Sequence, residues 1–80
     1  GGDGAVVQVS KDDGLTWSIL GSVGEGVEWY NTSGIAGLPG GQGLKGWSGR
    51  TMTNWVYARY PLDAYRGEPK LRFRLAFGSN

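Results

Sequence analysis

Two short runs of alternating apolar and polar residues flank an Asp-Gly turn near the start of the chain, over Ala5–Ser10 and Leu15–Leu20. A repeat of two residues is typical of a β-strand with one apolar face. The apolar positions are Val7, Val9, Leu15, Trp17 and Ile19. Between the runs, Lys11–Gly14 supplies the turn, because Asp bonds nearby backbone amides and Gly accepts positive φ. The stretch predicts an antiparallel hairpin around which the rest of the chain must fold.

The last strand is predicted over Lys70–Phe77, where apolar and basic residues alternate. The residues expected to face the core are Leu71, Phe73, Leu75 and Phe77. Lys70, Arg72 and Arg74 alternate with them and are expected to coat the solvent face. This is the clearest strand pattern in the chain.

The middle of the chain is richer in glycine and less regular. The expected segments are a short strand over Val27–Tyr30, a long loop over Asn31–Gly46, a strand over Trp55–Tyr60 and a bend over Pro61–Gly67. In the bend, Leu62 and Tyr65 are three residues apart and are expected to face inward. No segment has the pattern of an amphipathic helix.

One-sided strands with Gly-rich connections predict an all-β fold, an antiparallel β-sandwich of the jelly-roll type. The chain has 80 residues, of which 16 are Gly, and forms one domain over residues 1–80. Four or five strands are expected, whereas a jelly roll has about eight. The fold is therefore either a reduced sandwich or an incomplete one that lacks strands at its ends. Because the chain begins without Met, we expect it to be excised from a larger protein.

Composition argues against several functions. The chain has no His and no Cys, so it lacks the commonest general base and the commonest zinc ligands. Its net charge of +1 predicts no nucleic-acid partner, since such proteins carry basic patches. No apolar run is long enough to predict a membrane span. We therefore expect no enzyme activity.

The adjacent carboxylates Asp12 and Asp13 are the candidates for site chemistry. Capping of turn amides is the expected role of such residues. Calcium binding is the alternative, with Asp3 and Asp63 as further oxygen donors, because Ca²⁺ takes six to eight oxygen ligands. No other metal or cofactor is expected.

Aromatic residues of the central region form the candidate ligand site. Trp47, Tyr30 and Trp29 have flat faces that suit sugar rings, and Trp47 lies on a Gly-flanked loop. Core packing is the competing interpretation for aromatic residues, and it is the expected one for Trp17 and Trp55.

The turn matches a known motif. Ser10-x-Asp12-x-Gly14-x-Thr16-Trp17 resembles the Asp-box, S-x-D-x-G-x-T-W, which is similar to motifs on sialidase propeller blades and secreted bacterial β-modules. The resemblance implies that these residues hold a hairpin together: the Asp caps amides, the Gly takes the strained position, and the Trp packs below. It implies a structural role and no catalytic one.

The order of motifs along the chain resembles a wider family. The succession is Asp3-Gly4, the Asp-box, Trp29-Tyr30-Asn31, Gly46-Trp47-Ser48-Gly49, Trp55, Leu62-x-x-Tyr65-x-Gly67, Leu71-Arg72-Phe73-Arg74 and Phe77-Gly78-Ser79-Asn80. It is similar to jelly-roll modules of secreted Bacteroidetes surface proteins and of immune-inhibitor-A-type metallopeptidases, and broadly to MAM and galactose-binding-like sandwiches. Such modules usually have additional strands at both ends.

That resemblance implies an extracellular or cell-surface location. It also implies a non-catalytic accessory, adhesion or recognition role beside neighbouring domains of a parent protein. A surface protein or a glycan is the partner expected for such a module. A carbohydrate-binding module that uses the loop aromatics is the alternative function.

Overall fold

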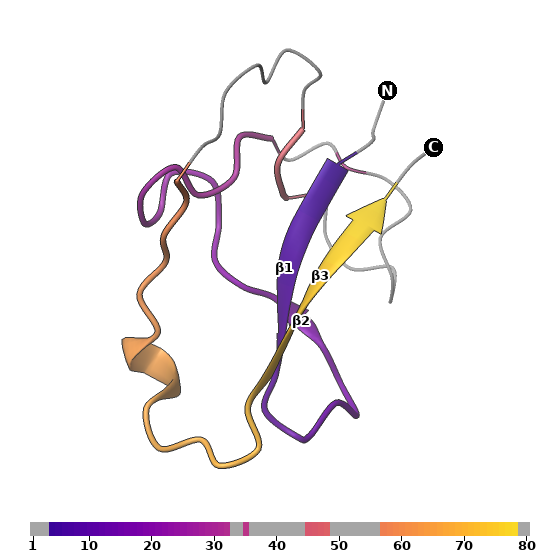
Figure 1. Ribbon diagram of the computed structural model, residues 1–80, viewed down its shortest axis with the longest axis vertical. Coiled ribbons are helices and arrows are strands. Elements are labelled where there is room, and N and C mark those ends of the chain that lie inside the picture. Colours follow the sequence, from indigo (N-terminus) through magenta and orange to yellow (C-terminus); the bar gives the residue numbers. More distant parts are fainter. Residues whose placement is uncertain (1–3, 33–34, 36–44, 49–56, 79–80) are drawn as a thin grey trace.

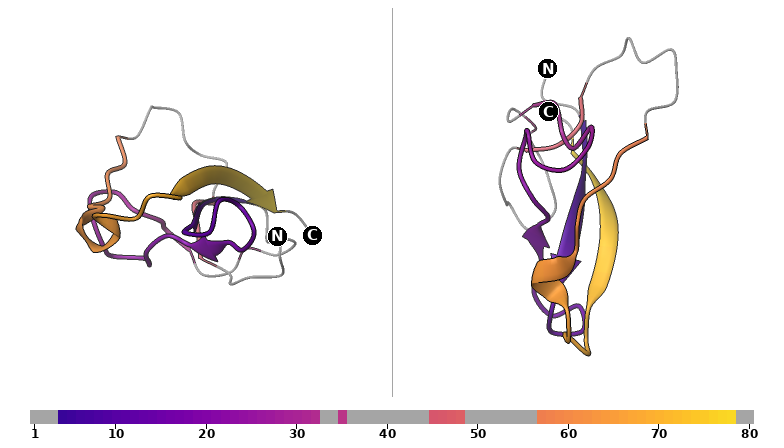
Figure 2. Two further views of the ribbon diagram at one scale, coloured as in Figure 1. Left: turned by 90° about the horizontal axis from the view of Figure 1, so that it is seen from below. Right: turned by 90° about the vertical axis from the view of Figure 1, so that its left-hand side faces the viewer.

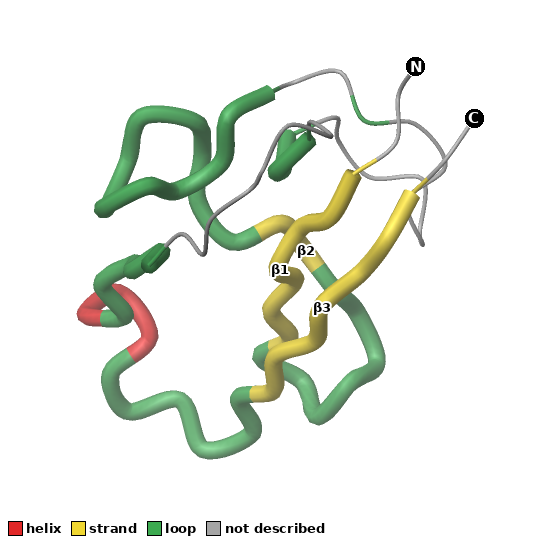
Figure 3. The backbone as a smooth tube through the Cα atoms, turned by 45° about the horizontal axis from the view of Figure 1, so that its top comes forward, coloured by secondary structure: helices red, strands yellow, loops and turns green. Residues whose placement is uncertain are grey.

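The protein is an all-β chain built on one antiparallel sheet. A computed structural model describes residues 4–32, 35, 45–48 and 57–78. Within them, β1 (Gly4–Ser10), β2 (Ser18–Ile19) and β3 (Arg72–Gly78) form a sheet of order β2-β1-β3 (Figure 1). A single turn of 3-10 helix, η2 (Asp63–Tyr65), lies in the segment before β3 (Figure 3). The all-β prediction is confirmed, and in the described residues no helix is long and apolar enough to cross a membrane.

The hairpin is present, but its second strand is shorter than expected. β1 matches the predicted first strand, and it pairs antiparallel with β2 through Gln8 opposite Ile19 and Val9 opposite Ser18. The prediction that Leu15 begins the second strand and faces the core is wrong, since its side chain is 84% exposed. The turn extends through Thr16, whose amide is bonded to Asp12 rather than to a strand.

β1 is buried on both of its faces. The sequence predicts an apolar and a polar face, but Gln8 and Ser10 are as fully buried as Val6. β2 and β3 flank the two edges of β1, and its buried polar side chains have internal partners: Ser10 lies within the turn, and Gln8 lies against Arg74. The Gln8 Oε1 accepts a hydrogen bond from Arg74 Nε at 2.6 Å.

The buried and exposed faces of β3 are the reverse of those predicted. Phe73, Leu75 and Phe77 are 43%, 56% and 69% exposed, whereas Ala76 is buried. Antiparallel pairing places Ala76 opposite Val6, and directly opposed side chains share a face. The aromatic layer packs on that face, so the large apolar residues of β3 point away from it. Of the basic residues, Lys70 and Arg72 are exposed as expected, but Arg74 is half-buried.

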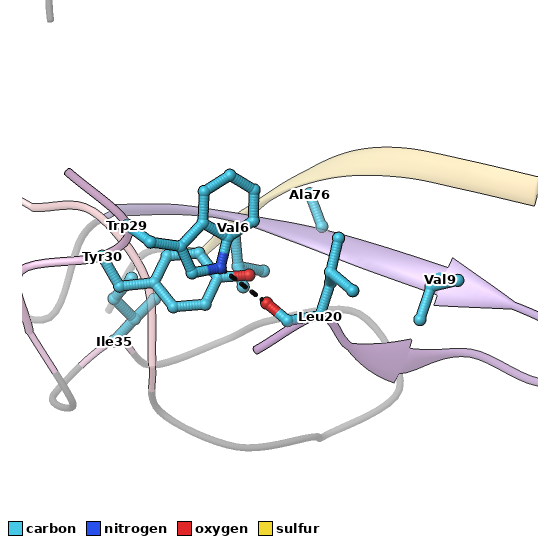
Figure 4. Close-up of a cluster of buried hydrophobic side chains, with 7 residues drawn as sticks. All are labelled: Val6, Val9, Leu20, Trp29, Tyr30, Ile35 and Ala76. Carbon is cyan, nitrogen blue, oxygen red and sulfur yellow. Dashed lines mark hydrogen bonds between the residues drawn. The ribbon is translucent and has the colours of Figure 1, made fainter. Parts of the chain in front are cut away.

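The core lies between the sheet and the loop that follows β2. Its buried members are Val6, Val9, Leu20, Trp29, Tyr30, Ile35 and Ala76 (Figure 4). The indole Nε1 of Trp29 donates to the carbonyl of Leu20, the residue after β2, at 2.8 Å, so the loop is bonded to its own start beside the sheet. The backbones of Ala5 and Trp47 pair in the same region.

Three predictions for the middle of the chain need correction. Val27–Tyr30 is not a strand: Val27 forms one isolated bridge with Arg59, and Glu28 and Tyr30 have φ of 52° and 53°, which interrupts an extended chain. The bend before β3 is confirmed as η2, but Leu62 is exposed rather than inward-facing. The predicted strand over Trp55–Tyr60 is not found in its described part, residues 57–60, which form only the isolated bridge at Arg59. Trp55 and most of the long loop lie outside the described residues.

Candidate functional site

The hairpin turn is organised around the hydroxyl of Ser10. This Oγ accepts from the backbone amides of Gly14 at 2.8 Å and Asp12 at 3.3 Å, and it donates to Asp12 Oδ1 at 2.7 Å. Ser10 is buried at the end of β1, so the hydroxyl links the last strand residue to both ends of the turn. One side chain thus provides hydrogen-bond acceptors for two turn amides that have no partner in a neighbouring strand.

The carboxylate of Asp12 binds the other side of the turn. Its Oδ1 accepts from the Thr16 amide at 2.8 Å, and its Oδ2 accepts from the Thr16 hydroxyl at 2.5 Å. These hydrogen bonds, with the Thr16 hydroxyl first, lower the pKa of Asp12 to about 2 from the usual 3.8. A carboxylate with so low a pKa is ionised at neutral pH and is a weak proton acceptor.

Gly14 and Trp17 complete the turn. Gly14 has a φ of 94°, a backbone conformation that residues with a side chain rarely adopt. Its carbonyl accepts a hydrogen bond from Trp17 Nε1 at 3.0 Å. The Arg74 guanidinium lies over the Trp17 ring, 4.2 Å from its centroid. The Trp17 ring is therefore held between the turn and β3.

Asp13 joins the turn to the segment that leads into β3. Its Oδ1 lies 2.6 Å from Arg72 Nε, and its amide donates to the Lys70 carbonyl at 3.1 Å. Both carboxylates of the turn therefore have partners within the protein. In the part of the chain that the structure describes, no group of three or more acidic residues converges as a metal would require.

Four aromatic rings form a second cluster beside the sheet: Trp29, Tyr30, Trp47 and Tyr60. Trp29 contacts the other three with centroid distances of 4.9–5.1 Å, and Tyr30 meets Trp47 edge-on at 4.7 Å. Such tilted and edge-to-face geometries are the favoured ones for aromatic pairs. The cluster connects the loop after β2 to Trp47 and to the chain that precedes η2.

Tyr30 ties this cluster to β1. Its hydroxyl donates to the Val7 carbonyl at 3.1 Å and accepts from the Val7 amide at 3.3 Å. Burial raises the pKa of Tyr30 to about 12, and burial together with the Glu25 carboxylate raises the pKa of Tyr60. Both phenols are therefore neutral at physiological pH.

The predicted ligand-site residues come together, but they are not equally open. Trp29 and Tyr30 are 8% and 5% exposed, so neither presents a free face. Trp47 is half-buried, and its Nε1 donates to the Glu28 carbonyl at 3.0 Å. Next to it, the side chain of Asn31 exchanges two hydrogen bonds with the backbone of Ser48. Of the three predicted residues, Trp47 is the one that a ligand can reach.

A feature that the sequence did not predict is an apolar surface on the outside of β3. We call Phe73, Leu75 and Phe77 the β3 apolar row; their side chains stand on one face of the strand. The alternation of these residues was visible in the sequence, but alternation alone does not say which face is covered.

No family model, curated protein or solved structure matches this chain.

Proposed function

We propose that this chain is a non-catalytic recognition module of a larger secreted or cell-surface protein, and that it contacts a protein partner through β3. The β3 apolar row carries the proposal. Three adjacent large apolar side chains on one sheet face are unusual on a surface that meets only water, and such patches are typical of interaction sites.

The chemistry of the turn supports a role without catalysis. A general base near neutral pH needs a pKa close to the working pH, whereas Asp12 has a pKa of about 2. Asp13 is paired with Arg72, and the chain contains no His and no Cys to activate a nucleophile. The Asp-box residues Ser10, Asp12, Gly14, Thr16 and Trp17 are then a folding device at the tip of the hairpin.

We also propose that the sheet is one layer of a jelly-roll-like β-sandwich. One face of the sheet packs on the aromatic cluster, and the β3 apolar row lies on the other. A sheet with apolar residues on both faces is what a second layer covers in a sandwich. In an accessory module, that layer comes from neighbouring domains of the parent protein or from a partner.

The proposal is tested by binding of the fluorescently labelled chain to surfaces coated with extracellular-matrix proteins. Leu75→Lys places a charge in the centre of the β3 apolar row and should weaken binding about tenfold or more. Leu15→Lys is the matched control, because Leu15 is even more exposed but lies in the turn. Equal losses in both variants, or no binding by the native chain, would count against recognition through β3.

A panel of ester, peptide and glycoside substrates tests the absence of catalysis. We expect no turnover. Turnover by the native chain that disappears in Asp12→Ala would replace the recognition proposal with an enzymatic one.

A carbohydrate-binding module is the second candidate, and the position of Trp47 favours it. The ring is held by Trp29, Tyr30 and the Glu28 carbonyl, so it is preorganised, while part of it faces solvent. The polar pair Asn31 and Ser48 lies beside it. A flat ring next to polar groups is the arrangement that a sugar requires.

A glycan array separates the two candidates. If Trp47 binds sugar, Trp47→Ala should abolish the signal, and Trp47→Phe, which preserves more of the packing, should reduce it. Tyr57→Ala is the control, since Tyr57 is exposed and outside the cluster. Melting temperatures of all variants show whether a loss reflects unfolding. If the native chain binds no glycan on the array, this candidate is removed.

A further inference from the structure

β3 is an edge strand without the usual protection against pairing. In the described residues, the sheet order β2-β1-β3 leaves no strand on its outer side, and Figure 2 shows β3 at the outside of the sheet. Its seven residues pair with β1 in continuous register, without a bulge. The strand contains neither Lys nor Pro, and its two charged residues, Arg72 and Arg74, are already paired with Asp13 and Gln8 of the same chain.

The hydrogen bonds of β1 reveal which of its backbone groups point away from β3. The amide and carbonyl of Ala5 exchange bonds with Trp47 at 2.9 and 2.7 Å. The Val7 carbonyl accepts from the Leu20 amide at 2.9 Å, and the Val7 amide donates to the Tyr30 hydroxyl. Ala5 and Val7 therefore direct both backbone groups to the side opposite β3.

The β3 residues opposite Ala5 and Val7 must then direct their backbone amides and carbonyls to the free edge of the sheet. Phe77 lies opposite Ala5, and Leu75 lies opposite Val7. In an antiparallel pair, residues that do not bond to each other both turn their amide and carbonyl groups outward. By the same alternation, the backbone groups of Phe73 also point outward. The three residues of the β3 apolar row therefore carry the backbone amides and carbonyls at the free edge.

We propose that this edge pairs antiparallel with β3 of a second copy of the chain, about a two-fold axis at Leu75. The inference rests on the proposed recognition through β3 and names its partner. Leu75 then lies opposite Leu75 of the second copy, and Phe73 lies opposite its Phe77. Each outward residue donates one backbone bond and accepts one, which satisfies the whole edge.

The charges of β3 favour this register. The axis at Leu75 places Arg74 opposite Ala76 of the second copy, and Arg72 opposite its Gly78, so no arginine faces another. Centring the axis on Arg74 instead would oppose two arginines directly, and centring it on Phe73 would oppose Arg72 to Arg74. Like charges in direct opposition destabilise a strand pair. An axis at Ala76 also avoids this clash but leaves fewer residues paired.

Pairing also joins the apolar rows of the two copies. Directly opposed residues share a face, so both rows come together on one side of the extended sheet. Phe73 then packs against Phe77 of the second copy, and the two leucines meet at the axis. Side chains that are 43–69% exposed in one chain gain apolar neighbours in the pair.

Sedimentation equilibrium of the 80-residue chain measures the pairing. We expect the mass to rise with concentration toward twice the 8.6 kDa of one chain. Leu75→Pro removes the central outward amide, which is the position where an edge strand tolerates proline, and should weaken self-association at least about tenfold. Leu75→Ala keeps the amide and should weaken it less.

Single cysteines test the register, because the native chain contains none. Across the axis at Leu75, the Cα atoms of Leu75→Cys should lie at about 5.5 Å, within disulfide reach. Phe73→Cys should not crosslink to itself, but it should crosslink to Phe77→Cys in a mixture. A Phe73→Cys homodimer that forms as readily as the Leu75→Cys one contradicts the register.

A chain that stays monomeric at every concentration overturns the pairing, and so does a dimer that Leu75→Pro leaves intact. Either result leaves recognition of other proteins to be decided by the binding assay with Leu75→Lys. The two proposals therefore fail in distinguishable ways.

Discussion

Asp12 and Ser10 show how two short polar side chains hold a hairpin turn. Ser10 Oγ accepts from the amides of Asp12 and Gly14, while the Asp12 carboxylate accepts from the amide and hydroxyl of Thr16. The charge of Asp12 is used for hydrogen bonding within the turn. That use explains the low pKa and is incompatible with proton transfer near neutral pH.

The acid dependence of stability should report on Asp12. Its pKa falls from 3.8 to about 2 on folding, so its ionised form stabilises the folded state above pH 3.8. This contribution is lost as the pH falls through about 2. In thermal melts from neutral pH downward, native protein and Asp12→Asn should therefore differ most at neutral pH and converge in acid. A gap that is as large at pH 2 as at neutral pH would contradict the assignment.

Gly14 should not accept a branched side chain. At its φ of 94°, Gly14→Val should destabilise the fold by about 1–3 kcal/mol. Gly14→Asn is the control, because Asn tolerates positive φ better than Val does, and it should cost less. Denaturant unfolding measures both, and an unchanged midpoint for Gly14→Val would contradict the turn geometry.

The central strand β1 depends on polar as well as apolar contacts. Gln8 accepts from Arg74, and Val7 exchanges two hydrogen bonds with the hydroxyl of Tyr30. β2 ends at Ile19, and beside Val7 the Leu20 amide bonds to the Val7 carbonyl while the Tyr30 hydroxyl bonds to the Val7 amide. A loop side chain thus completes the ladder of a strand.

Tyr30→Phe should destabilise the protein by about 1 kcal/mol, because it leaves the Val7 amide without its partner. Denaturant unfolding at neutral pH measures the loss. Tyr65→Phe is a suitable control, since Tyr65 belongs to η2, whereas it is the Tyr30 hydroxyl that bonds to Val7. Equal stability of native protein and Tyr30→Phe would contradict the role of the hydroxyl.

Ionisation of Tyr30 should also lower the stability of the fold at alkaline pH. Burial raises the pKa of Tyr30 from 10.0 to about 12, so its neutral form stabilises the fold below pH 10. That stabilisation is lost as the pH rises through 12. Tyr30→Phe should flatten the fall in stability over this interval, with a remainder from Tyr60, whose pKa is also raised. Tyrosinate absorbance during titration identifies the late-ionising phenol.

In the described part of the chain, apolar residues lie on both faces of the sheet. The aromatic cluster covers Val6 and Ala76, whereas the β3 apolar row stays exposed. A larger protein, a second chain or a partner surface is needed to remove that row from water. The exposed row therefore connects the fold to the proposed recognition.

Leu75→Lys should alter the surface without harming the fold. Leu75 is 56% exposed, so the substitution should change the free energy of unfolding by about 0.5 kcal/mol or less. Binding of an apolar fluorescent dye such as ANS should fall relative to the native chain, because the β3 apolar row is interrupted. Unchanged dye binding, or a large loss of stability, would show that Leu75 lies in a covered environment.

Local patterns along the chain were sufficient for several features. The all-β character, the first strand and the bend near Tyr65 follow from short-range signals: alternation, turn residues and Pro positions. These signals act over a few residues, and neighbouring backbone conformation is decided at that range. The ligand, the cellular location and the accessory role stay predictions.

Long-range packing decided which face of each strand is buried. Phe73, Leu75 and Phe77 are exposed, whereas Gln8 and Ser10 are buried, because the buried aromatic residues pack on the face of the sheet that carries Val6 and Ala76. A period of two specifies that a strand has two different faces. Which face meets a covering layer depends on segments far away in the sequence, so the tertiary structure alone determines it.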